Sequence, residues 1–135
     1  MSEIIIFDTS VLVDDLRTGR HQRKIQSMTG LLRTSSVVLA ELWRGATNPA
    51  EQRLLRTLER NHPVLTPTKK NWLESGQILA RIRAHTGFSP EKLRDLHFHV
   101  LIALTARSHG ARVITSNGTD FTLIQRYRKF EFELW

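Results

Sequence analysis

Three carboxylates and one amide in this 135-residue chain stand beside apolar stretches, where they could converge on a ligand. Asp8 directly follows the apolar run 4–7, Glu41 lies within an apolar segment, and Asn117 and Asp120 follow another apolar run. Carboxylates that converge repel one another unless they share a proton or a cation. Hard oxygen ligands around open positions suit Mg²⁺ or Mn²⁺. The sequence therefore predicts a divalent-metal site.

The charge of the chain indicates what such a site would act on. Its 20 Lys and Arg residues exceed its 13 Asp and Glu residues, which gives a net charge of +7. Such a surplus attracts polyanions, nucleic acid first, although it also describes a merely solubilising surface. A phosphodiester needs a cation to approach carboxylates, and a divalent ion supplies one while lowering the pKa of an attacking water. Metal-dependent phosphodiester hydrolysis is the chemistry that we expect.

Several other classes of protein are excluded by what the sequence lacks. With no cysteine, there is no disulfide scaffold, thiolate cluster or cysteine nucleophile. The glycine-rich phosphate loops, the HExxH zinc pair and the GxSxG elbow are also missing. No apolar run approaches the roughly 20 residues of a membrane span, and the first residues lack a basic signal-peptide start. We therefore expect a soluble cytoplasmic protein with no membrane contact.

The candidate ligands must be positioned by alternating strands and helices. Apolar runs predict strands at 4–7, near Val37 and Val38, at 62–65, at 112–115 and at 130–134. Helical spacing predicts helices around 11–16, in a segment that reaches Leu32, and at 38–43, 49–58, 68–85 and 93–109. The pairs Asn48-Pro49, Thr66-Pro67 and Ser89-Pro90 predict helix starts, and Trp72, Phe98 and Phe121 are expected in the core.

This alternation predicts a single α/β domain over residues 1–135. Right-handed crossovers would place helices on both faces of a mainly parallel sheet, in three α/β/α layers. In such sheets a ligand binds beyond the carboxyl ends of the strands, where the strand order reverses. A reversal between the first strand and the strand ending near Thr115 would bring Asp8 to Asn117 and Asp120.

Three blocks of the sequence resemble, in order, the blocks of PIN-domain ribonucleases. They are the segments around Asp8, around Glu41 and from Leu101 to Phe121, and the likeness spans nearly the whole chain. It is closest to the small toxins of VapBC-type toxin–antitoxin pairs. The resemblance implies four or five parallel strands in the order 3-2-1-4-5, a Mg²⁺- or Mn²⁺-dependent endoribonuclease, frequent homodimers, and a VapB-like antitoxin that covers the site.

The resemblance also assigns roles to individual residues. It implies that Asp8, Glu41 and Asp120 are catalytic metal ligands and that Asn117 stands where some members have Asp. Three small polar residues would support the carboxylates by hydrogen bonds: Thr9, Ser10 and Thr115. Basic residues are candidates for RNA contact that the sequence does not separate from ordinary surface charge: Arg17, Arg44, Arg81, Arg83 and Arg112.

One position departs from the family pattern. His99 stands where these proteins usually have Asp, and an imidazole nitrogen suits Mn²⁺ better than Mg²⁺. Asp95, one helical turn earlier, is an alternative ligand. The expected endoribonuclease therefore has a rival, a catalytically impaired PIN-like domain that binds RNA or protein. A third reading is a regulatory subunit that binds DNA only together with its antitoxin.

Overall fold

The computed structural model describes residues 3–135, and its five strands form one parallel sheet. At the centre, β1 (Ile4–Phe7) pairs with β2 (Leu31–Ser35) on one side and with β4 (Ala111–Thr115) on the other. The edges are β3 (Val64–Leu65) beside β2 and β5 (Glu131–Leu134) beside β4. The order β3-β2-β1-β4-β5 confirms the predicted topology, and the strand order reverses between β1 and β4.

Alternate residues of the central strands face two different apolar layers, as a parallel sheet covered on both sides requires. Ile5 and Phe7 pack with Val11 of α1 on one face, whereas Ile6 and Val113 belong to the larger core on the other. The helices that supply these layers are α1 (Thr9–Thr18), α2 (Gln22–Ser27), α3 (Ser36–Gly45), α4 (Pro49–Asn61), α5 (Lys69–Thr86), α6 (Pro90–Ser108) and α7 (Gly118–Gln125).

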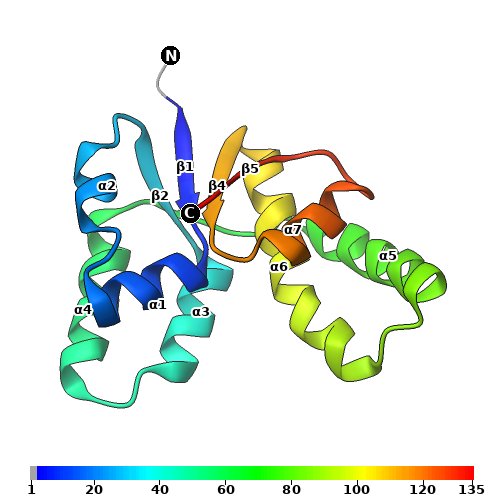
Figure 1. The fold of residues 1–135 in the computed structure, drawn as a ribbon, viewed down its shortest axis with the longest axis horizontal. Helices are drawn as coiled ribbons and strands as arrows, with labels where there is room; N and C mark the ends of the chain where they lie inside the picture. The colour runs from blue at the N-terminus through cyan, green and yellow to red at the C-terminus, as the bar shows by residue number, and fades with distance from the viewer. Residues whose placement is uncertain (1–2) are drawn as a thin grey trace.

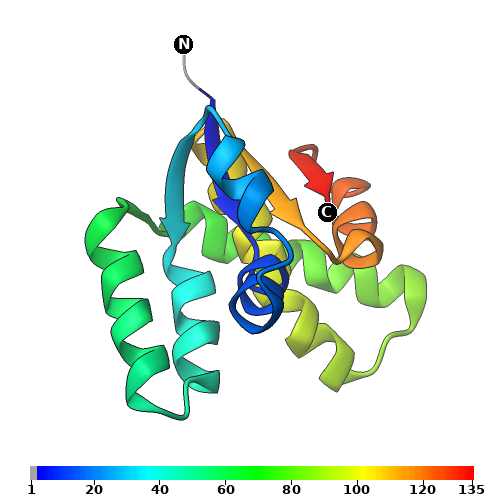
Figure 2. The same cartoon turned by 60° about the vertical axis from the view of Figure 1, so that its left-hand side comes forward.

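Two pairs of helices extend past the carboxyl ends of the central strands. Figures 1 and 2 show the α3–α4 pair on one side and the α5–α6 pair on the other, with α1 between them. The space beyond β1 and β4 is thus enclosed by elements from both halves of the chain. No helix among residues 3–135 is both long and apolar enough to cross a membrane.

The predicted helix starts are confirmed at two of three positions. Asn48 and Ser89 cap α4 and α6, and each side chain accepts a hydrogen bond from the third residue of its helix. The start at Thr66-Pro67 is wrong by two residues. Thr68 caps α5 instead, because its side chain and that of Asn71 each accept a hydrogen bond from the other's backbone N–H.

The second strand also differs from its prediction. The strand expected near Val37 and Val38 lies at Leu31–Ser35, and the helix expected to reach Leu32 ends at Ser27. The side chain of Ser35 accepts hydrogen bonds from the N–H groups of both valines, so the chain is already helical there. As a consequence, Glu41 lies in the second turn of α3 and does not directly follow a strand.

One expected core residue lies at the surface. Phe121 is fully buried and Phe98 packs against the core, but Trp72 is 52% exposed. On α5 the polar residues Asn71 and Ser75 face inward, since they bond to Ser108 and His97 of α6. This polar contact turns the adjacent Trp72 outward.

Candidate active site

Asp8 lies at the carboxyl end of β1 and is completely buried. Its Oδ2 accepts hydrogen bonds from the hydroxyls of Thr115 (2.8 Å) and Ser10 (2.9 Å). Its Oδ1 has no hydrogen-bond partner among the described residues. A buried carboxylate oxygen without a partner is costly, and a bound cation would remove that cost. Asp8 thus has one oxygen fixed by the fold and one left for a ligand.

Glu41 reaches the same region from α3. Its Oε1 accepts a hydrogen bond from Thr9 Oγ1 at 2.9 Å, so the first residue of α1 holds the second carboxylate in place. Burial raises the pKa of Glu41, and this effect exceeds the lowering by the hydrogen bond from Thr9 and by His99; the charge of Asp8 adds a smaller rise, and Arg44 lowers the pKa least. A raised pKa caused partly by a second carboxylate is what a cation between the two would reverse.

Asp120 lies in the first turn of α7, and both of its carboxylate oxygens are engaged. Its Oδ1 is 3.0 Å from Lys92 Nζ, and its Oδ2 is 3.0 Å from His99 Nδ1 and 3.1 Å from Asn117 Nδ2. Burial would raise the pKa of Asp120, but Lys92, His99 and Asn117 together bring it below its ordinary value. Asp120 is therefore ionised at neutral pH and neutralised by its neighbours.

The three carboxylates do not form one compact ligand shell. Among residues 3–135, no three His, Cys, Asp or Glu side chains are close enough together to hold a metal ion. The unpartnered Oδ1 of Asp8 and the carboxylate of Glu41 nevertheless fit a hard divalent cation by chemistry. The carboxylate oxygens of Asp120 are already engaged by Lys92 and His99.

The small polar residues connect the ends of β1 and β4. The hydroxyl of Thr115 donates to Asp8 and accepts from the N–H of Asn117, while Ser10 Oγ donates to Asp8 and accepts from the N–H of Ser116. Asn117 Oδ1 in turn accepts from the N–H of Asp120 and caps α7. This chain of hydrogen bonds sets the position of α7 relative to Asp8.

The alternative ligand and the basic candidates are spread more widely. Asp95 is exposed, and among the described residues no hydrogen bond or ion pair joins it to the three carboxylates. Arg44 lies near the site, since its charge acts on Glu41 while its guanidinium stacks 5.4 Å from the ring centre of Phe98. Arg112 instead pairs with Glu3 and Glu133, toward the amino end of β4.

The remaining basic candidates lie on exposed helix surfaces. Arg81 and Arg83 are on α5, where Arg81 stacks 5.0 Å from the ring centre of Tyr127. Arg17 is on α1 and lines an apolar pocket between α1, α3 and α4. Only Arg17 and Arg44 of this group are therefore placed beside the carboxylates or an adjoining pocket.

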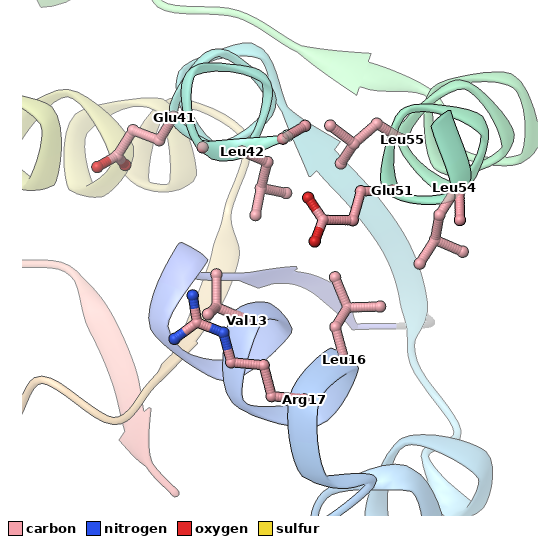
Figure 3. A pocket seen from close by; sticks show the side chains of 11 residues that line it. Val13, Leu16, Arg17, Glu41, Leu42, Glu51, Leu54 and Leu55 are labelled. Carbon is pink, nitrogen blue, oxygen red and sulfur yellow. The ribbon is translucent and has the colours of Figure 1, made fainter. Parts of the chain in front are cut away.

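That apolar pocket has a volume of about 290 Å³ and reaches Glu41. Leu16 and Leu54 line it and are 50% and 44% exposed. Figure 3 shows that the carboxylate of Glu41 points away from these leucines, whereas the carboxylate of Glu51 points into the pocket, so the pocket has mostly apolar walls and two acidic side chains. The sequence analysis did not identify this pocket, because its walls come from three helices.

Lys92 is the functional candidate that the sequence analysis missed. It lies in the first turn of α6, seven residues before His99. Seven residues are close to two helical turns, so both side chains lie on one helix face and both reach Asp120. That spacing was a usable signal, but it becomes informative only once α6 is known to pack beside α7.

Comparisons with known proteins agree with this arrangement. A family model described as PIN domain matches residues 5–127. Among curated protein sequences, none matches the chain. Solved structures do match it over nearly their whole length.

Three of these structures come from complexes of one type. A chain of VapBC-1 from nontypeable Haemophilus influenzae is 21% identical, with a TM-score of 0.71 and 98% coverage of both chains. A chain of VapBC2 from Rickettsia felis, bound to a DNA fragment from its promoter, is 19% identical with a TM-score of 0.71 and 98% coverage of both chains. A chain of DNA-bound VapBC from Salmonella typhimurium is 25% identical with a TM-score of 0.67, covering 100% of this chain and 99% of that one.

Proposed function

The chain belongs to the PIN domain family, and from that premise we propose that it is a divalent-metal-dependent endoribonuclease that acts as the toxin of a toxin–antitoxin pair. PIN-domain proteins are generally nucleases that use divalent metal ions. The finer assignment to RNA and to a toxin is supported by the VapBC complexes among the similar structures and by the net charge of +7.

One observation carries the proposal. Asp8 is fully buried at the strand-order reversal, with one carboxylate oxygen held by two hydroxyls and the other without a partner. The fold buries a carboxylate here, which is unfavourable for stability unless a ligand binds to it. Glu41 lies near enough to act on the same ligand, since the charge of Asp8 contributes to the raised pKa of Glu41.

In this site Asp8 and Glu41 would hold Mg²⁺ or Mn²⁺, and the ion would supply charge neutralisation and an activated water. The residues of the chain do the positioning. Ser10 and Thr115 fix Oδ2 of Asp8, so that Oδ1 faces the ligand. Thr9 holds Glu41. Asn117 and Asp120 stand on the β4 side, where Asn117 orients the carboxylate of Asp120.

The test is incubation of the purified chain with cellular RNA in Mg²⁺, Mn²⁺ or EDTA, beside Asp8→Ala and the control Asp15→Ala. Asp15 lies on the outer part of α1, where its Oδ1 accepts from the backbone N–H of His21. We expect discrete fragments that need metal, that are absent with Asp8→Ala and that persist with Asp15→Ala. Intact RNA in every lane from folded protein would contradict the proposal.

A second candidate function rests on His99. A PIN-like domain that binds RNA or protein without cleavage is favoured by His99, whose imidazole bonds to Asp120 and stands where the family usually has a further carboxylate. His99→Asp separates the two functions. Cleavage that appears only in this variant would establish the impaired domain, whereas cleavage by the natural chain would dismiss it.

The partner that we propose is a VapB-like antitoxin. The similar structures are complexes, and the pocket lined by Leu16 and Leu54 ends at Glu41, so an apolar segment bound there would also block the site. Two of those complexes contain DNA, and we propose that this chain joins DNA only through its antitoxin. Gel-shift assays with the chain alone and with its antitoxin test this point.

The proposal includes three further expectations about the protein. Residues 1–135 act as one domain, the chain forms homodimers, and its RNA substrate places it in the cytoplasm. Light scattering coupled to size-exclusion chromatography measures the oligomeric state. A strictly monomeric chain at high concentration would remove the homodimer from the proposal without affecting the site.

A further inference from the structure

Beside the carboxylates, a groove of about 790 Å³ runs over α7 and the start of α6. This volume lies within the range of small-molecule and nucleotide sites. Lys92, Asp120 and Arg126 line it, together with Ser116 and Gly118 at the start of α7. The N–H of Ser116 donates to Ser10, and Ser10 donates to Asp8, so the groove adjoins the candidate active site.

Lys92 is the charged group that faces both the site and the groove. Its ammonium lies 3.0 Å from Asp120 Oδ1, but its side chain remains 41% exposed. An ammonium has three donors, and among the described residues one hydrogen bond is recorded for Nζ. Its backbone is fixed by the cap of α6, because the N–H of Lys92 donates to Ser89 Oγ at 3.2 Å. An ammonium on a fixed backbone, at the wall of a groove and with further hydrogen-bond donors, can bind a phosphate.

Asp120 determines whether a second metal ion can bind on the side of the site next to the groove. With one oxygen on Lys92 and the other on His99 and Asn117, its carboxylate has no oxygen without a donor. Two-metal sites hold their ions roughly 3.5–4 Å apart and need carboxylates for both. Here the position beyond Asp8 and Glu41 already carries a positive charge from the protein.

We propose that Lys92, anchored on Asp120, binds a phosphate of the substrate in the place of a second metal ion, so that the chain holds one divalent ion on Asp8 and Glu41. This assignment rests on the proposed function and adds to it the number of ions and the residue that contacts the scissile region. Arg126 and the N-terminal end of α7 extend the positive wall of the groove for the neighbouring phosphates.

The first measurement is Mn²⁺ binding by calorimetry, with no RNA present. We expect one ion for the natural chain, none for Asp8→Asn, and two for the double variant Lys92→Gln with His99→Asp, which frees Asp120 and restores a carboxylate. Two ions in the natural chain would overturn the inference and leave the proposed function intact. No Mn²⁺ binding by the folded natural chain would overturn both.

The second measurement is the binding of a short fluorescein-labelled single-stranded RNA in EDTA, where cleavage does not occur. Lys92→Gln is expected to weaken binding roughly tenfold and to reduce the slope of log affinity against log salt by about 0.7, the value for one lost phosphate contact. The matched control is Lys69→Gln, the same change on an exposed lysine in the first turn of α5.

The control variant Lys69→Gln separates a specific phosphate contact of Lys92 from a general effect of positive charge on RNA binding. Lys69→Gln is expected to leave the salt slope unchanged, and circular dichroism should show that both variants are folded at the temperature of the binding assay. Equal slopes for Lys92→Gln and the natural chain, or equal losses for the two variants, would overturn the role of Lys92.

Discussion

Nδ1 of His99 lies 3.0 Å from Oδ2 of Asp120. His99, which departs from the family pattern, is therefore hydrogen-bonded directly to Asp120, which agrees with that pattern. The His99 ring also lies 5.2 Å from the ring centre of Phe121, between the core and the site. His99 therefore does more than remove a carboxylate. Its imidazole bonds to Asp120 from the α6 side, while the ammonium of Lys92 pairs with Asp120 from the groove.

The first prediction concerns this pair. Without metal, His99→Asp should destabilise the fold by about 1.5 to 3 kcal/mol, because a hydrogen bond to the Asp120 carboxylate becomes a repulsion between carboxylates. Adding Mn²⁺ should recover stability, by about 2.7 kcal/mol at a hundredfold excess over its dissociation constant. Urea unfolding with and without Mn²⁺ measures both effects. His99→Asn, which keeps a donor and adds no charge, should gain no more stability from Mn²⁺ than the natural chain does.

The second prediction concerns Thr115, whose hydroxyl is fully buried against Asp8. Thr115→Val keeps the shape but removes a donor from a buried carboxylate, which should cost about 1 to 3 kcal/mol in the free energy of unfolding. Chemical denaturation measures this loss, and Thr115→Ser, which keeps the hydroxyl, is the control. Equal stability of the valine variant and the natural chain would mean that Asp8 does not depend on this hydrogen bond.

The third prediction is a pH dependence that comes from Glu41. Its ordinary pKa is 4.5, and burial raises it in the folded chain by more than the hydrogen bond from Thr9 and the effect of His99 lower it. As the pH rises above 4.5, the unfolded chain releases its proton first, so ionisation of Glu41 lowers stability until the pH passes the folded pKa. Glu41→Gln, which retains an acceptor for Thr9, should therefore be more stable than the natural chain at pH 7 and lose this advantage below pH 4.5.

Thermal unfolding of both proteins from pH 4 to pH 8 measures the difference. Divalent metal should then stabilise the natural chain and leave Glu41→Gln nearly unchanged, since the ion replaces the repulsion between Glu41 and Asp8 by attraction. A constant stability difference across the pH range would show that Glu41 ionises in the folded chain as it does in the unfolded one.

The fourth prediction concerns the helix that carries one wall of the apolar pocket. Leu55 is the buried residue of α4 and is 3% exposed, whereas its neighbour Leu54 is 44% exposed. Leu55→Ala should cost about 2 to 5 kcal/mol and loosen α4, which amide hydrogen exchange would detect. Leu54→Ala should change stability by less than about 0.5 kcal/mol but weaken antitoxin binding. Equal effects of the two changes on stability would contradict the structure of this helix.

The alternation of apolar runs and helical spacings indicated a parallel sheet, and the resemblance of three sequence blocks to PIN-domain ribonucleases supplied the strand order that the structure shows. The runs at 4–7 and 112–115, rich in β-branched residues, predicted buried strands, and the proline and cap pairs at Asn48 and Ser89 mark helices by local chemistry. Local patterns were ambiguous at Val37 and Val38, where β-branched residues predicted a strand, but the side chain of Ser35 starts a helix. Propensity is a weak signal where one capping side chain decides the backbone.

The candidate site shows the same division between what the sequence predicted and what the tertiary structure decided. Asp8, Glu41 and Asp120 were identified from the sequence, because each follows or lies within an apolar segment that must be buried, where an acidic residue needs a reason. Their pairing was decided only by the tertiary structure. That Asp120 is engaged by Lys92 and His99, and that Oδ1 of Asp8 is left without a partner, depends on how α6, α7 and β1 pack. Such contacts join residues far apart in the chain, and no local pattern encodes their geometry.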